Sequence, residues 1–169
     1  MTKSPTVEEL QKAVSDVCGI LASQNQYELG WMFSCTRNIR GYEGRPKENA
    51  QIQARLDNAV GGVSVVYIFA LLESYIPRSV WQYAEDEHRD RMYAYLHIRN
   101  TCAHGFDGAR ADRYKDKFDT VMASDKPILH IERYDANAII VQPSVWQPLK
   151  DFIPTFLGSI LQKVINYGY

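Results

Sequence analysis

The sequence lacks the long apolar segments by which membrane and secreted proteins are recognised. Its longest apolar-leaning run, Ala59 to Leu72, covers 14 residues, whereas a membrane-spanning helix needs about 20. The first residues, Met1 to Glu9, contain no hydrophobic stretch of the kind that signal peptides carry. We therefore expect no membrane partner and a cytoplasmic location.

Cysteine is also scarce, and the formal charge is nearly balanced. Cys18, Cys35 and Cys102 are odd in number and widely spaced, which argues against a disulfide framework and against a zinc site. We expect them to be buried thiols. The net charge of -1 provides no global attraction for nucleic acid, so any polyanion would have to bind at a local basic patch.

Two stretches have a local excess of basic residues. Residues 31–56 contain five Lys or Arg against two Asp or Glu, and residues 87–117 contain seven against five. Solvent-exposed helix faces also have charge counts of this size, so the excess alone does not establish binding. The candidate RNA contacts within the two stretches are Arg37, Arg40, Arg110 and Arg113.

Helical periodicity dominates the apolar pattern. Thr6 and Glu9 have the spacing of a capping box, so the first helix is expected to begin at about residue 7. Residues 41–48 combine glycine, proline and charge and predict a loop. The expected helices cover residues 7–23, 27–37, 49–76, 86–104, 110–123 and 144–167.

One segment near the C-terminal end has a different pattern. Residues 128–134 alternate and are β-prone, 135–137 predict a turn, and 139–141 predict a return strand. The composition, 46% apolar over 169 residues, is that of one domain. We expect an all-α fold: a bundle of four to six helices over about 7–123 and 144–167, with a β-hairpin over about 128–141 appended.

Common catalytic motifs are absent. The chain contains no Gly-x-x-x-x-Gly-Lys, no Gly-x-Ser-x-Gly and no His-Glu-x-x-His, which are the signatures of P-loop NTPases, α/β-hydrolases and zinc proteases. His97 and His104 are seven residues apart and share a helix face, a spacing that two metal ligands could use. Two histidines do not complete a metal site, so we expect neither a metal nor a cofactor.

The most informative residues lie towards the end of the expected helix 86–104. Met92, Leu96, Arg99 and Ala103 recur at helical spacing, which places a guanidinium that cannot be neutralised within an apolar stripe. Glu73 interrupts the apolar face of the preceding helix in the same way. Because a buried charge without a partner is strongly unfavourable, we predict that Glu73 approaches Arg99.

His104 follows Arg99 by five residues and precedes Gly105, a residue typical of a helix end. When the 2'-hydroxyl of RNA attacks the adjacent phosphodiester, cleavage requires two groups. One exchanges a proton near neutral pH, and the other supplies a fixed positive charge. Five residues of a straight helix separate the two side chains by about 140° and about 7.5 Å along the axis, so they do not converge. Either the helix unwinds at His104, or two copies of the motif meet across a twofold axis in a homodimer.

The run from Arg99 to His104, Arg-Asn-Thr-Cys-Ala-His, resembles the Arg-x(4–6)-His signature of the HEPN superfamily. The segment Phe69 to Tyr75 resembles the central helix of that family, and the resemblance covers about residues 51–106. It implies an all-α bundle, a homodimer and, in many members, metal-independent cleavage of RNA.

By position, the resemblance assigns four roles. Arg99 would stabilise the phosphorane, His104 would exchange the proton, and Asn100 would orient the site. Glu73 would hold the arginine. The resemblance also implies a role in defence or as a toxin, with an antitoxin or defence protein as partner. HEPN toxins modified by nucleotidyltransferase antitoxins usually carry Tyr two residues after the His; this chain has Phe106 there, which puts such an antitoxin in doubt.

Two other interpretations stay open. Arg99 and Glu73 could form a purely structural ion pair while His104 caps a helix C-terminus, where an imidazolium suits the helix dipole. Many HEPN domains also bind nucleotides, RNA or protein partners without cleaving RNA. A non-catalytic regulatory module is therefore the alternative function.

Overall fold

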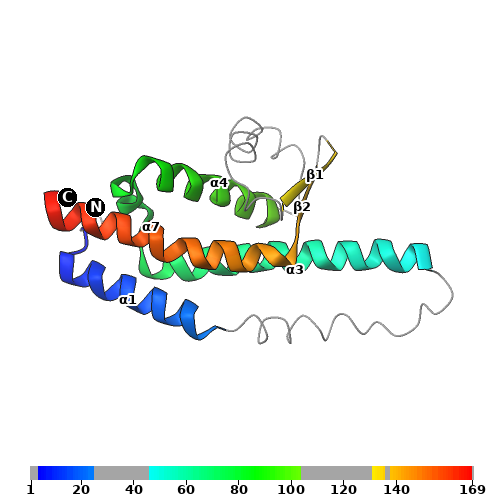
Figure 1. Ribbon diagram of the computed structural model, residues 1–169, viewed down its shortest axis with the longest axis horizontal. Helices are drawn as coiled ribbons and strands as arrows, with labels where there is room; N and C mark the ends of the chain where they lie inside the picture. Colours follow the sequence, from blue (N-terminus) through cyan, green and yellow to red (C-terminus); the bar gives the residue numbers. More distant parts are fainter. Residues whose placement is uncertain (1–3, 25–45, 104–130, 136–137, 169) are drawn as a thin grey trace.

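The computed structural model describes residues 4–24, 46–103, 131–135 and 138–168, and this part of the chain is mostly helical, as predicted (Figure 1). The helices expected over 27–37 and 110–123 lie outside the described residues. The helical elements are α1 Val7–Ser23, α3 Pro46–Tyr75, the 3-10 helix η1 Arg78–Tyr83, α4 Asp86–Ala103, the 3-10 helix η3 Pro143–Val145 and α7 Trp146–Tyr167.

The first helix, α1, begins at the predicted capping box. The Thr6 hydroxyl accepts a hydrogen bond from the backbone N–H of Glu9 at 3.2 Å, and the Glu9 carboxylate accepts one from the backbone N–H of Thr6 at 2.7 Å. These bonds satisfy backbone donors that have no partner within the helix. Leu10, Val17 and Leu21 then bury one face of α1. The predicted start of this helix is confirmed.

Two helix boundaries differ from the prediction. The loop expected over 41–48 is wrong for residues 46–48, because Pro46 begins α3. Proline suits a first helical turn, where no backbone N–H needs an intrahelical acceptor and φ is already helical. The last helix, expected from residue 144, begins at Trp146, because η3 occupies the preceding three residues.

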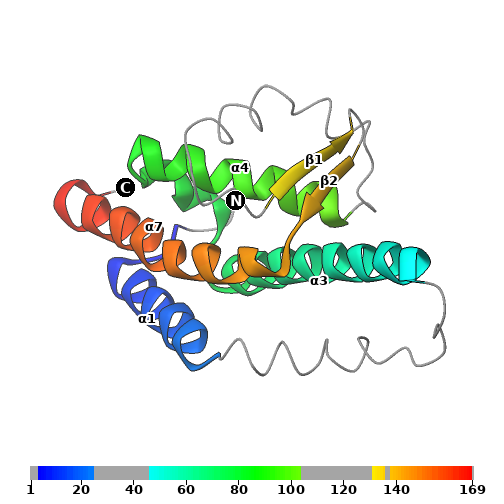
Figure 2. The same cartoon turned by 45° about the vertical axis from the view of Figure 1, so that its right-hand side comes forward.

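α3 and α7 lie at the centre of the described structure, with α1 on one side and α4 on the other (Figures 1 and 2). Trp81 of η1 is fully buried where these elements meet. Its ring centroid lies 6.2 Å from that of Phe69 in α3 and 5.6 Å from that of Phe156 in α7. A buried tryptophan of this kind contributes about 3–5 kcal/mol relative to alanine, so η1 is held firmly against both helices.

Within the described residues, one segment, Asn58–Tyr75 of α3, is long and apolar enough by composition to cross a membrane. The central helix of a protein core meets the same criterion. Val65, Phe69 and Leu72 of this segment are buried in the core, and 39% of the segment is buried in all.

Two short strands, β1 Ile131–Asp135 and β2 Ala138–Val141, pair antiparallel, with Ile131 opposite Val141. They fall within the segment where a hairpin was expected. The end of β2 lies on α3: the backbone N–H of Val141 donates to Asn58 Oδ1 at 2.7 Å. Gly61, one helical turn further along α3, lies so close to the Val141 carbonyl that a β-carbon there would overlap it. The missing side chain of Gly61 therefore permits this contact.

Replacement of Gly61 tests how closely β2 packs on α3. Gly61→Ala is expected to destabilise the protein by about 2 kcal/mol, because the new β-carbon would meet the main chain of Val141 and Gln142. Gly158→Ala in α7 is the matched control, since a β-carbon there meets nothing within 4 Å and alanine should stabilise the helix by up to about 1 kcal/mol. Urea unfolding measures both; equal stability of the two variants would contradict the close contact.

Candidate functional site

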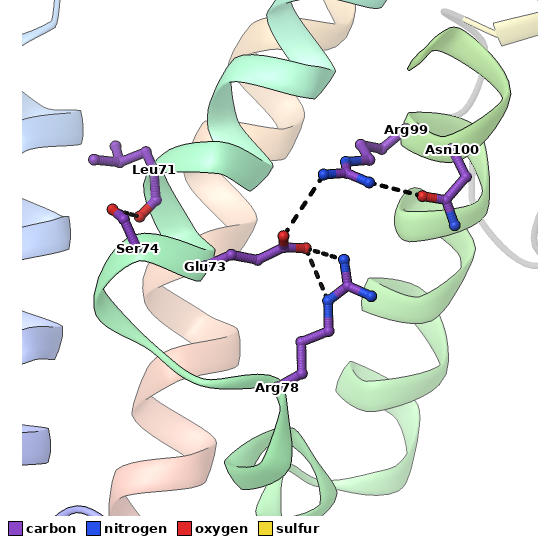
Figure 3. A network of polar contacts seen from close by, with 6 residues as sticks. All are labelled: Leu71, Glu73, Ser74, Arg78, Arg99 and Asn100. Carbon is purple, nitrogen blue, oxygen red and sulfur yellow. Dashed lines mark hydrogen bonds and ion pairs between the residues drawn. The ribbon is translucent and has the colours of Figure 1, made fainter. Parts of the chain in front are cut away.

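The site predicted from the sequence centres on the Arg99 guanidinium of α4 and the Glu73 carboxylate of α3. Arg99 Nη2 lies 3.6 Å from Glu73 Oε2 (Figure 3). The predicted approach of these two residues is confirmed. At this distance the pair is an ion pair rather than a close hydrogen bond, so Glu73 attracts the guanidinium without fixing all of its donors.

Asn100 makes the second contact to the guanidinium. Arg99 Nη1 donates to Asn100 Oδ1 at 2.9 Å. The two terminal nitrogens of Arg99 are thus occupied by different partners, one from its own helix and one from α3. Among the described residues, Arg99 Nε has no hydrogen-bond partner although it is buried. The guanidinium is therefore oriented but retains donor capacity.

Both charged side chains are less buried than the sequence predicted. Arg99 is 25% exposed and Glu73 is 24% exposed, so the acid and the base that were expected to be buried are only partly buried. The apolar stripe on α4 explains the exposure of Arg99, since Met92 is fully buried, Leu96 is nearly so, and Ala103 is exposed. The stripe runs from the core to the surface, and long side chains near its end bring their charges to solvent.

Arg78 also belongs to the site, although the sequence did not predict it. Its Nε donates to Glu73 Oε1 at 2.9 Å, and its Nη2 contacts the same oxygen (Figure 3). Arg78 lies beyond Pro77, where α3 has ended and η1 begins, so helical spacing says nothing about where its side chain points. The one available signal was a second arginine only five residues from Glu73.

The structure brings together Arg78, Glu73, Arg99 and Asn100, and it leaves the remaining predicted residues untested. His104, the predicted proton-exchanging residue, lies outside the described residues. So do the four candidate RNA contacts, Arg37, Arg40, Arg110 and Arg113. In the part of the chain that is described, no three His, Cys, Asp or Glu side chains lie close enough to hold a metal ion.

Cys102 lies within the same motif, three residues after Arg99. Burial raises the pKa of its thiol to about 12, because a thiolate loses its hydration in an apolar environment. Burial also raises the pKa of Cys18, and neither residue is in a disulfide. Cys102 is therefore a protonated packing residue at neutral pH and is unsuited to act as a nucleophile.

Comparison of the chain with protein-family profiles, with curated protein sequences and with solved structures finds no match in any of the three. Functional argument for this site therefore depends on its own residues and their chemistry.

The thiol of Cys102 provides a direct test of its environment. Because the pKa is raised, the reactive thiolate is scarce at every pH well below about 12. At pH 8, iodoacetamide should alkylate Cys102 at least about 100-fold more slowly in the folded protein than in urea. Quantitative mass spectrometry of the Cys102 peptide measures both rates. Similar rates in the two states would show that the thiol is not buried.

Proposed function

We propose that this protein is a metal-independent endoribonuclease of the HEPN type, with an HEPN-like helical bundle and an appended hairpin. It acts as a homodimer in which Arg99 of one chain and His104 of the other form each site. RNA is the substrate, and the cellular role is in defence or as a toxin, controlled by an antitoxin or defence protein. The proposed location is the cytoplasm.

The observation that carries the proposal is the state of the Arg99 guanidinium. It is oriented by Glu73 at 3.6 Å and by Asn100 at 2.9 Å, yet a quarter of the side chain is exposed. A pentavalent phosphorane carries more negative charge than the phosphodiester from which it forms. A cation that is already oriented stabilises this charge without reorganising during the reaction.

In the proposed reaction, the 2'-oxygen of RNA attacks the adjacent phosphorus and the bond from phosphorus to the 5'-oxygen breaks. His104 accepts the proton of the 2'-hydroxyl as a general base, and the leaving 5'-oxygen takes up a proton from an imidazolium or from water. The products are a 2',3'-cyclic phosphate and a 5'-hydroxyl. Every proton and bond is accounted for by RNA, imidazole and water, so the mechanism requires no metal.

A non-catalytic RNA- or partner-binding module is the second candidate. The interactions that already occupy Arg99 favour it, because the contact between Glu73 and Arg99 also joins α3 to α4. An ion pair in that position can serve the fold without any chemistry. The two candidates make different predictions for RNA cleavage.

Cleavage of RNA in the presence of a chelator distinguishes the nuclease from the non-catalytic binding module. Purified protein is expected to cleave single-stranded RNA in EDTA and to leave 2',3'-cyclic phosphate ends. Arg99→Ala and His104→Ala should each reduce the rate at least about 100-fold, because each removes a group that stabilises the transition state or transfers a proton in it. End-group analysis and single-turnover kinetics provide the measurements.

Arg89→Ala is the control for this experiment. Arg89 also lies on α4 and pairs with a carboxylate, Asp86, at 2.9 Å, but it lies outside the proposed site. The Arg89→Ala variant should cleave RNA at the wild-type rate. Cleavage that survives unchanged in both Arg99→Ala and His104→Ala would refute the nuclease assignment, and intact RNA with wild-type protein would favour the binding module.

Subunit mixing tests the composite site. If Arg99 and His104 act across the dimer, a heterodimer of Arg99→Ala and His104→Ala chains has one intact site and one site lacking both groups. Random exchange of the two inactive variants should therefore restore about a quarter of wild-type activity, since about half of the dimers are mixed and each has one of two sites. Sites contained within single chains would give no recovery, which would refute the composite arrangement.

A further inference from the structure

Arg78 makes the Glu73 and Arg99 pair into a cluster of two cations and one anion. Glu73 Oε1 accepts two contacts from Arg78, and Glu73 Oε2 faces Arg99 (Figure 3). The three side chains come from α3, η1 and α4. Guanidinium groups do not lose their protons in proteins, so the cluster has a net charge of +1 whenever Glu73 is ionised.

The two arginines do not share Glu73 equally. Arg78 is the closer partner: its Nε donates at 2.9 Å, and its Nη2 contacts the same oxygen. Arg99 makes one contact to Glu73, at 3.6 Å, and its Nε has no hydrogen-bond partner among the described residues. The negative charge of Glu73 is thus compensated mainly by Arg78, because shorter charge-assisted hydrogen bonds are stronger. Arg99 therefore has an unused donor within a cluster that carries one excess positive charge.

The position of Arg78 suits it to compensate the charge of Glu73. Its side chain is 46% exposed, more than that of either Glu73 or Arg99, and its guanidinium carbon lies 5.9 Å from the centroid of the buried Trp81 ring. A cation within about 6 Å of an aromatic ring is attracted to its face. Arg78 therefore contacts both Glu73 and Trp81 at the surface edge of the cluster.

We propose that Arg78 is a positioning residue that binds Glu73 and so leaves Arg99 able to bind a phosphate group of single-stranded RNA. This inference rests on the proposed function and extends it by a residue outside the Arg-x4-His motif. Without Arg78, Glu73 would pair fully with Arg99 and the cluster would be neutral. Removing Glu73 as well would restore a net charge of +1 through Arg99 alone.

Binding of an oligonucleotide that cannot be cleaved tests the inference apart from catalysis. The probe is a fluorescently labelled single-stranded RNA with 2'-O-methyl riboses, which lack the attacking hydroxyl. Fluorescence anisotropy across a salt series gives the affinity and its salt dependence. Arg78→Gln should bind about fivefold more weakly, with a salt slope smaller by about 1, because the site has lost one positive charge.

Removal of the carboxylate provides the decisive comparison. Glu73→Gln should bind at least as tightly as wild type, and Glu73→Gln with Arg78→Gln should return to within about twofold of wild type. Arg78→Lys keeps the charge and should also bind within about twofold. A purely structural role of Arg78 predicts no such rescue. Arg89→Gln, which removes an arginine from the Asp86 pair, is the matched control and should bind as wild type does.

The outcomes separate this inference from the nuclease assignment. Unchanged binding by Arg78→Gln, a double variant as weak as Arg78→Gln, or no binding by wild type would each overturn the inference. The expected order of affinities in a protein that leaves natural RNA intact would support the anion site and refute the nuclease. Circular dichroism and thermal unfolding check every variant. If Arg78→Gln does not fold, tighter or equal binding by Glu73→Gln supports the inference and weaker binding overturns it.

Discussion

The candidate site depends on the pairing of the Glu73 carboxylate with two arginines, because this pairing joins three elements that are separate along the chain. It lies in the last turn of α3, accepts from Arg78 at the start of η1 and faces Arg99 near the end of α4. An unpaired carboxylate there would be unfavourable, and one arginine would suffice to neutralise it. The second arginine leaves an excess positive charge at the surface, which is a property that a site for phosphate requires.

The apolar core explains why these charges can be held in fixed positions. Trp81 is buried against Phe69 and Phe156, so the 3-10 helix that begins with Arg78 is packed between α3 and α7. Along the apolar stripe of α4, exposure increases from Met92 and Leu96 to Arg99 and Ala103. The polar cluster therefore lies where the core meets solvent. Aliphatic stems pack there while guanidinium groups remain within reach of a ligand.

The proposed chemistry separates binding from proton transfer. Arg99, with its partners, supplies a fixed charge, whereas His104 would supply the group that titrates near neutral pH. Helix geometry keeps these two functions from converging within one straight helix. Symmetry would resolve this, because a twofold axis places the cation of one chain beside the imidazole of the other. Cys102, although it lies between them in sequence, remains a protonated packing residue.

The sequence by itself determined the helical character, the capping box at Thr6 and the approach of Glu73 to Arg99, because each follows from local spacing or from the need to pair a charge in an apolar face. Only the tertiary structure decided how exposed that pair is and that Arg78 joins it. It also decided that Gly61 admits the end of β2. These features depend on where a chain goes after a helix ends and on which elements meet in space, and helical periodicity contains no information about either.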